Sequence, residues 1–172
     1  MSIPTFPQMQ HFFTLVADGK VTTKNFQAFL ANPNGFVKDV KKEKFSSFVI
    51  AAKYGYTVVE DVEPSQFKVK NLKFITFLES GESYITGETM RQRAVTLKGN
   101  IGLVDGQYLL DHQDEIPKEM RGKYIVFPGT LLRGSGGGLG VAYLSWDGDC
   151  WVLSFHWLDG VWIVDVRFAR CE

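Results

Sequence analysis

The stretch WDGDCWVLSFHWLDGVW, residues 146–162, decides the fold. It holds all four tryptophans of the chain, and two Asp-Gly steps separate its runs of aromatic and aliphatic residues. Such runs, bounded by short Asp-Gly loops, are typical of antiparallel β-hairpins. We therefore predict one hairpin around loop 147–150 and a second hairpin around loop 158–161.

The spacing of the tryptophans follows from these two hairpins. Residues that face each other across an antiparallel pair carry their side chains on the same face of the sheet. Counting outward from each loop places Trp146 opposite Trp151 and Trp157 opposite Trp162. We expect these pairs to fix the register and the helices to cover their face. Alternatively, rings at the sheet ends protrude past the core and bind a ligand or a partner.

The same counting sorts the other residues of the sheet onto its two faces. Across the second loop, the predicted opposite pairs are Val164–Phe155 and Val166–Leu153. Besides the tryptophans, the face predicted to meet the helices holds Ala142, Leu144, Leu153, Phe155, Val164, Val166 and Phe168. The other face, predicted to be polar and solvated, holds Tyr143, Ser145, Cys150, Val152, Ser154, His156, Ile163, Asp165 and Arg167.

Helical and extended segments precede this region. Apolar residues recur at helical spacing within 1–55 and again within 87–116, whereas 56–87 is rich in residues typical of strands. The final third predicts strands at 124–133, 141–146, 150–157 and 162–170. We therefore predict an α+β fold, with N-terminal and central helices packed on a C-terminal antiparallel β-meander of about four strands. Residues 1–55 would form a helical unit and residues 56–172 an α+β unit, within one continuous body.

The composition is that of a globular chain without an electrostatic bias. The 172 residues are 45% hydrophobic and 14% aromatic, with 19 basic and 19 acidic side chains. A net charge near zero supplies no global field that would draw nucleic acid or anionic lipid. The first residues do not resemble a secretory signal, and no apolar run reaches the length of a membrane span. We therefore expect a cytoplasmic protein with no membrane partner and with free cysteines.

One group of polar residues invites a catalytic interpretation. The predicted register sets Ser154 across from Asp165 and His156 diagonal to it, so a hydrolase-like enzyme is one alternative. A triad needs hydrogen-bond reach and an oxyanion hole, which a flat sheet face does not supply. The loop GSGGGLG at 134–140 departs from phosphate-binding patterns, and the titratable run 111–115 is interpreted as a solvated helix end. We predict no cofactor and no metal site.

A nucleic-acid-binding alternative rests on the densest basic cluster of the chain. The cluster consists of Lys38, Lys41, Lys42 and Lys44. These side chains would contact phosphates while aromatic rings of the sheet stack on bases. Acidic residues interleave with the lysines, a pattern that favours a solvated helix face over a phosphate-binding stripe.

Several phrases, spread over most of the chain, resemble a group of small uncharacterised bacterial proteins with a helical start and a tryptophan-rich end. The phrases are VTTKNFQAFLANPN, MRQRAVTLKGNIGLVDGQYLLDHQDEIP, RGKYIVFPGTLLR, WDGDCWVLSFHWL and RFAR. The resemblance implies a bacterial, cytoplasmic origin and brings no activity or site residue with it. We therefore expect a non-catalytic binding or assembly protein, which binds a protein partner or itself. The candidate binding residues are Trp146, Trp151, Trp157, Trp162, Lys38, Lys41, Lys42 and Lys44.

Overall fold

The computed structural model describes residues 46–171 of the chain. The α-helices of this part are α4 (Ser47–Lys53), α5 (Gly87–Thr96) and α6 (Leu103–Asp111), and the 3-10 helices are η1 (Val69–Asn71), η2 (Gln113–Glu115) and η3 (Lys118–Met120). The strands are β1 (Thr57–Glu60), β2 (Leu72–Ile75), β3 (Tyr84–Thr86), β4 (Tyr124–Arg133), β5 (Leu139–Trp146), β6 (Trp151–Trp157), β7 (Val161–Ile163) and β8 (Val166–Cys171). The helices predicted before residue 46 lie outside the described residues.

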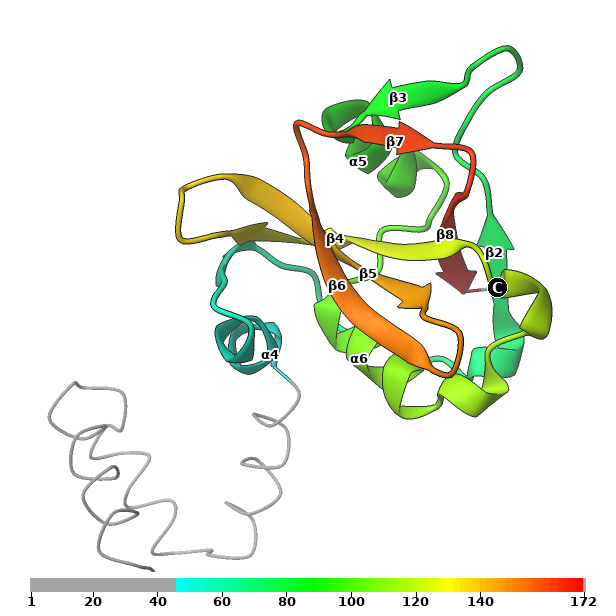
Figure 1. Cartoon of the computed structure of the whole chain (residues 1–172), viewed down its shortest axis with the longest axis horizontal. Helices are drawn as coiled ribbons and strands as arrows, with labels where there is room; N and C mark the ends of the chain where they lie inside the picture. The colour runs from blue at the N-terminus through cyan, green and yellow to red at the C-terminus, as the bar shows by residue number, and fades with distance from the viewer. Residues whose placement is uncertain (1–45, 172) are drawn as a thin grey trace, which may run out of the picture. The chain divides into compact units, whose positions relative to one another are not determined.

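The strands form one large mixed sheet and one small antiparallel pair, so the predicted α+β class is confirmed (Figure 1). The large sheet runs in the order β2-β8-β4-β5-β6, and β1 pairs with the C-terminal half of β4. The consecutive strands β4, β5 and β6 form the expected antiparallel meander. The first predicted hairpin is confirmed in full, because Trp146 pairs with Trp151 and Leu144 pairs with Leu153.

The second predicted hairpin is wrong. Trp162 pairs with Ile85 of β3 instead of Trp157, and the chain turns again at Val164 and Asp165. β8 then runs parallel to β4, where Phe168 lies beside Val126. The predicted pairs Val164–Phe155 and Val166–Leu153 therefore do not form. The physical reason is that β8 gains two hydrogen-bonded neighbours, β4 and β2, whereas a return along β6 would give it one.

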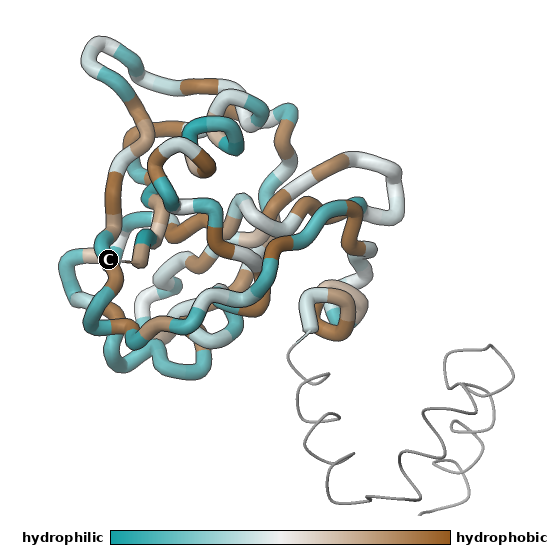
Figure 2. Tube along the Cα trace, turned by 180° about the vertical axis from the view of Figure 1, so that it is seen from behind, coloured by the Kyte–Doolittle hydropathy of each residue, from teal (hydrophilic) through white to brown (hydrophobic). Residues whose placement is uncertain are grey.

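Each face of the large sheet is covered by a different layer (Figure 1). On one face, α4 and α6 enclose a core that includes Leu109, Phe127 and Leu144. On the other face, α5 and the β3–β7 pair enclose a second core that includes Met90, Trp162 and Phe168. Hydrophobic residues recur along the central strands, whereas the segment from the end of α6 through η3 is largely hydrophilic (Figure 2). The prediction that the face carrying Tyr143 is solvated is therefore wrong at that residue, because Tyr143 packs against the second core.

The short helix α4 joins the core of the sheet. Ser46 caps its first turn by accepting a hydrogen bond from the Val49 N–H at 3.3 Å, and Gly55, with φ +79°, follows its end. Ile50 and Ala51 are buried against the same cluster that α6 covers. α4, the one described helix of the predicted helical unit 1–55, therefore packs in one core with the strands.

A buried polar network fixes the start of α6. The Asp105 carboxylate accepts hydrogen bonds from the backbone N–H groups of Gly102 at 3.1 Å and Ser65 at 2.9 Å. The Thr130 hydroxyl accepts the Leu103 N–H at 2.8 Å and donates to Asp61 at 2.7 Å. Burial raises the pKa of Asp105, while the two backbone donors act in the opposite direction. The network ties β4 and the loop after β1 to the N-terminus of α6.

The C-terminus of α5 ends in a Schellman motif. Lys98 adopts the left-handed conformation, with φ +57°, a conformation that glycine usually occupies at the end of a helix. Its N–H bonds Val95 O at 3.1 Å and the Gly99 N–H bonds Ala94 O at 2.8 Å, a Schellman motif. Because a side chain in this conformation costs about 1 kcal/mol, we expect Lys98→Gly to raise the free energy of unfolding by up to about 1 kcal/mol.

Urea denaturation followed by far-UV circular dichroism measures this change. Gly99→Ala is the matched control, because a Cβ at Gly99 would lie 2.6 Å from the Cβ of Phe168 and should destabilise the protein. A Lys98→Gly variant that is less stable than the parent would contradict the assignment of backbone strain to Lys98.

Candidate functional site

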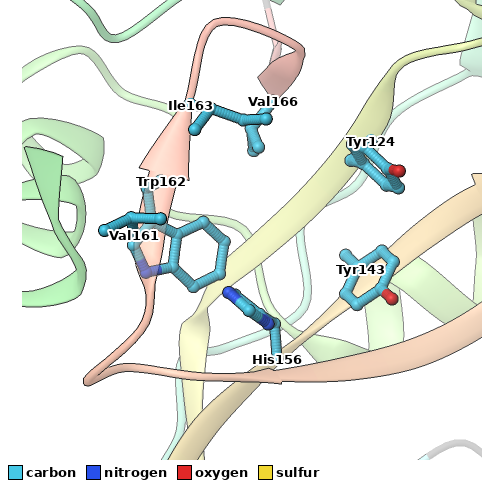
Figure 3. A pocket seen from close by; sticks show the side chains of 7 residues that line it. All are labelled: Tyr124, Tyr143, His156, Val161, Trp162, Ile163 and Val166. Carbon is cyan, nitrogen blue, oxygen red and sulfur yellow. The ribbon is translucent and has the colours of Figure 1, made fainter. Parts of the chain in front are cut away.

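A pocket with a volume of about 280 Å³ opens between β7 and the face of the large sheet that α5 covers (Figure 3). Its lining side chains come from five strands and are Tyr124, Tyr143, His156, Val161, Trp162, Ile163 and Val166. The His156 and Trp162 rings lie on one side and the Tyr124 and Tyr143 rings on the other (Figure 3). The pocket is therefore walled by aromatic rings and aliphatic side chains, with no Lys, Arg, Asp or Glu among them.

The register of the strands places these rings together. Tyr143 lies between Val126 of β4 and Ser154 of β6, so it shares a face with His156 two residues further along β6. The Tyr124 and Tyr143 rings meet edge to face at 5.6 Å between centroids, and the His156 and Trp162 rings do so at 4.9 Å. These edge-to-face contacts hold the rings at fixed angles and favour a preformed pocket.

Trp162 anchors β7 on the sheet. It is 2% exposed, and its indole Nε1 is buried without a hydrogen-bond partner among the described residues. An unpaired buried donor costs about 1–3 kcal/mol, so apolar packing must outweigh that cost at this position. Trp162 therefore belongs to the core and shows part of its ring to the pocket.

An ion pair lies next to the pocket without lining it. The Lys123 ammonium lies 2.5 Å from the Asp165 carboxylate, and the Tyr124 N–H donates to Asp165 O at 3.0 Å. The hydrogen bond from Lys123, and then its charge, hold the pKa of Asp165 below its usual range. Asp165 is thus paired with a cation and is not placed to orient a histidine.

The three residues of the hydrolase-like alternative are not brought together by the sheet. Ser154 of β6 pairs with Tyr143 of β5. Asp165 lies in the turn between β7 and β8. The structure shows no hydrogen bond among Ser154, His156 and Asp165, and only His156 of the three lines the pocket. Ser154 does not face Asp165 because the predicted second hairpin does not form.

The other tryptophans occupy distinct environments. Trp151 is 3% exposed and meets Trp146 edge to face at 5.9 Å, and the Arg121 guanidinium lies 4.0 Å from the centre of the Trp146 ring. Trp157 is 43% exposed and packs over the backbone of the glycine-rich loop, where a Cβ at Gly134 would approach it to 2.5 Å. Of the four tryptophans predicted as binding residues, Trp162 alone lines the pocket.

The remaining polar candidates have local structural partners. Within run 111–115, Asp111 accepts a hydrogen bond from Gln107 at 2.8 Å, and Gln113 accepts the Trp151 N–H at 2.8 Å. Cys150 and Cys171 are free thiols, and burial raises the pKa of both. No cluster of three or more His, Cys, Asp or Glu side chains in residues 46–171 could hold a metal ion.

The predicted basic cluster of Lys38, Lys41, Lys42 and Lys44 lies outside the described residues. Within the described part of the chain, no helix is long and apolar enough to cross a membrane. Comparison of the chain with family models, with curated proteins and with solved structures finds no match. The geometry of the pocket is therefore the main guide to function.

Sequence reasoning missed the pocket. It placed His156 and Tyr143 on one face of the sheet correctly but treated that face as solvated. The predicted second hairpin paired Trp162 with Trp157, and this pairing put Trp162 on the opposite face. The short strand β3, residues 84–86, pairs with β7 and carries one buried side chain, Ile85. Its alternation of buried and exposed residues is too short for the sequence to indicate which strand it pairs with.

Proposed function

We propose that this chain is a non-catalytic, cytoplasmic binding or assembly protein, whose pocket accepts an aromatic side chain of a protein partner. The observation that carries the proposal is the apolar pocket of about 280 Å³. Ligand pockets for drug-sized molecules start at about 300 Å³, so this one suits a single ring system. Its walls offer ring faces and edges rather than charges, which favours an aromatic group over an ion.

The rim of the pocket favours a protein over a free small molecule. Exposed hydrophobic side chains lie at the pocket and next to it. Among the lining residues, Val161 is 61% exposed, and Tyr124 and Ile163 are each 41% exposed. Tyr84, which pairs with Ile163, is 63% exposed, and Val164, which follows Ile163, is 56% exposed. Exposed apolar side chains gathered around one pocket are typical of protein–protein interfaces, where an anchor residue fills the pocket and its neighbours exclude water. Two free thiols are consistent with a reducing compartment, which supports the cytoplasmic assignment.

Titration with free indole and p-cresol tests the pocket itself. These compounds reproduce the side chains of tryptophan and tyrosine, and the methyl resonances of Val161, Ile163 and Val166 report their entry. We expect shifts confined to the lining residues, and we expect Ile163→Glu to abolish them. Val152→Glu is the matched control, because Val152 is 37% exposed on β6 and does not line the pocket.

Two results distinguish binding of an aromatic group in the pocket from recognition of a protein partner. No shift up to the solubility limit of either compound, or shifts that survive Ile163→Glu, would overturn binding at this pocket. Tryptophan-containing peptides in a randomised set should bind more tightly than indole, because the rim adds contacts. If no peptide bound better than indole, the protein-partner part would be wrong.

A further inference from the structure

The strand β6 ends the large sheet and exposes an unprotected edge. In the described part of the chain, β6 pairs with β5 alone. Its sequence, WVLSFHW, contains no Lys, Arg, Asp, Glu, Pro or Gly, and its pairing with β5 runs without a bulge from Trp151 to Trp157. Proteins usually protect such edges with charges, prolines or bulges. β6 carries none of these features, so it is suited to pair with another strand.

The hydrogen bonds at the two ends of β6 show which backbone groups point outward. Asp147 N–H donates to Cys150 O at 3.1 Å, and Leu158 N–H donates to Leu139 O at 2.8 Å. In an antiparallel pair, hydrogen-bonded and non-hydrogen-bonded positions alternate. The even-numbered residues of β6 therefore bond to β5, and the odd-numbered residues direct their N–H and C=O groups to the free edge.

One of these outward amides is already used. The side chain of Gln113 accepts the Trp151 N–H at 2.8 Å, which closes the edge at the start of β6. Among residues 46–171, the amides of Leu153, Phe155 and Trp157 have no hydrogen-bond acceptor, and they are symmetric about Phe155. A second copy of β6 that bonds to all three across a two-fold axis must pair with its centre at Phe155.

We propose that β6 pairs with β6 of a second copy of this chain, antiparallel, about a two-fold axis at Phe155. The symmetric set of amides is self-complementary, as an interface between two identical subunits requires. Phe155 would face its own copy, and Leu153 would face the second copy's Trp157, so that aromatic and aliphatic side chains meet across strands. With 19 basic and 19 acidic residues the chain carries no net charge to oppose self-association.

The exposure of the strand agrees with this pairing. Trp157 is 43% exposed, and Phe155 is half-buried beneath Tyr56, whose ring stacks on it at 4.4 Å between centroids. The rings of Tyr54 and Tyr56 therefore extend the apolar surface that flanks the edge. The second copy would cover this surface, and the pocket beside β7 plays no part in the pairing.

Site-directed cross-linking of the full chain tests the register. In a background with Cys150→Ser and Cys171→Ser, Phe155→Cys should form a disulfide-linked dimer, because directly opposed Cα atoms lie about 5.5 Å apart, within disulfide range. Val152→Cys is the matched control, because in this register it would lie about 20 Å from its copy. A chain that sediments as a monomer would overturn the proposal. So would equal cross-linking of both variants.

A second pair of variants tests the backbone contact. Trp157→Pro removes an outward N–H, whereas Trp157→Thr removes the same indole and keeps the N–H. We expect the proline variant to weaken dimerisation about tenfold or more relative to the threonine variant, measured by sedimentation equilibrium. Equal dimerisation of the two would show that association uses another surface. Binding of unrelated extended peptides to β6 in a monomeric chain would assign the edge to a different partner and would also refute the dimer.

Discussion

Replacing Trp151 with alanine is expected to lower the free energy of unfolding by about 3–5 kcal/mol, the range for large buried aromatic residues. Trp151 is 3% exposed and packs with the core that α6 covers. Its ring meets Trp146 edge to face, so the truncation also removes an aromatic pair. Because the burial and the aromatic contact are lost together, the loss should be large.

Trp157→Ala is the matched comparison, because it removes the same side chain from the other end of the same strand. Trp157 is 43% exposed, and we expect a loss of only about 1–2 kcal/mol. Urea denaturation followed by far-UV circular dichroism measures both, at two protein concentrations so that self-association is accounted for. Equal losses for the two variants would contradict the assignment of Trp151 to the core and Trp157 to the surface.

The contrast between the two hairpins shows what the sequence could and could not predict. The register of Trp146 with Trp151 follows from a short loop and a period of two, both local properties. Strand alternation identifies the face on which a side chain lies but not the strand beside it. Trp162 fits the alternation of a second hairpin equally well, although its partner is Ile85 in a distant segment.

The candidate site depends on such long-range pairing. Trp162 reaches His156 because β7 leaves the large sheet and pairs with β3. Tyr124 and Val166 meet because β8 returns parallel to β4. A parallel neighbour needs a long connection and leaves no local signature, so the sequence could suggest the aromatic residues but not their common pocket.

The second large effect is expected at Gly129, where β4 departs from regular pairing. Between Phe127 and Leu132 the register with β5 shifts, and the Gly129 N–H bonds Ile101 O at 3.0 Å instead of β5. A Cβ at Gly129 would lie 2.6 Å from Val62 Cγ2, 2.7 Å from Asn100 O and 2.9 Å from Ile101 O. Two of these atoms are backbone carbonyls, which cannot rotate away. We therefore expect Gly129→Ala to destabilise the protein by about 1–3 kcal/mol, towards the upper end.

Gly136→Ala is the control for the general effect of adding a methyl group to a glycine. A Cβ at Gly136 meets nothing within 4 Å and requires no left-handed backbone. We expect that variant to be neutral or stabilised by about 0.4–1 kcal/mol, because alanine reduces the freedom of the unfolded chain. Thermal unfolding of the two variants, compared with the parent, measures the difference. A Gly129→Ala variant as stable as Gly136→Ala would mean that β4 does not approach the loop before α6 as closely as the structure shows. Because Arg91 of α5 also bonds Pro128 O at 3.2 Å, a shift of this segment should disturb α5 as well as α6.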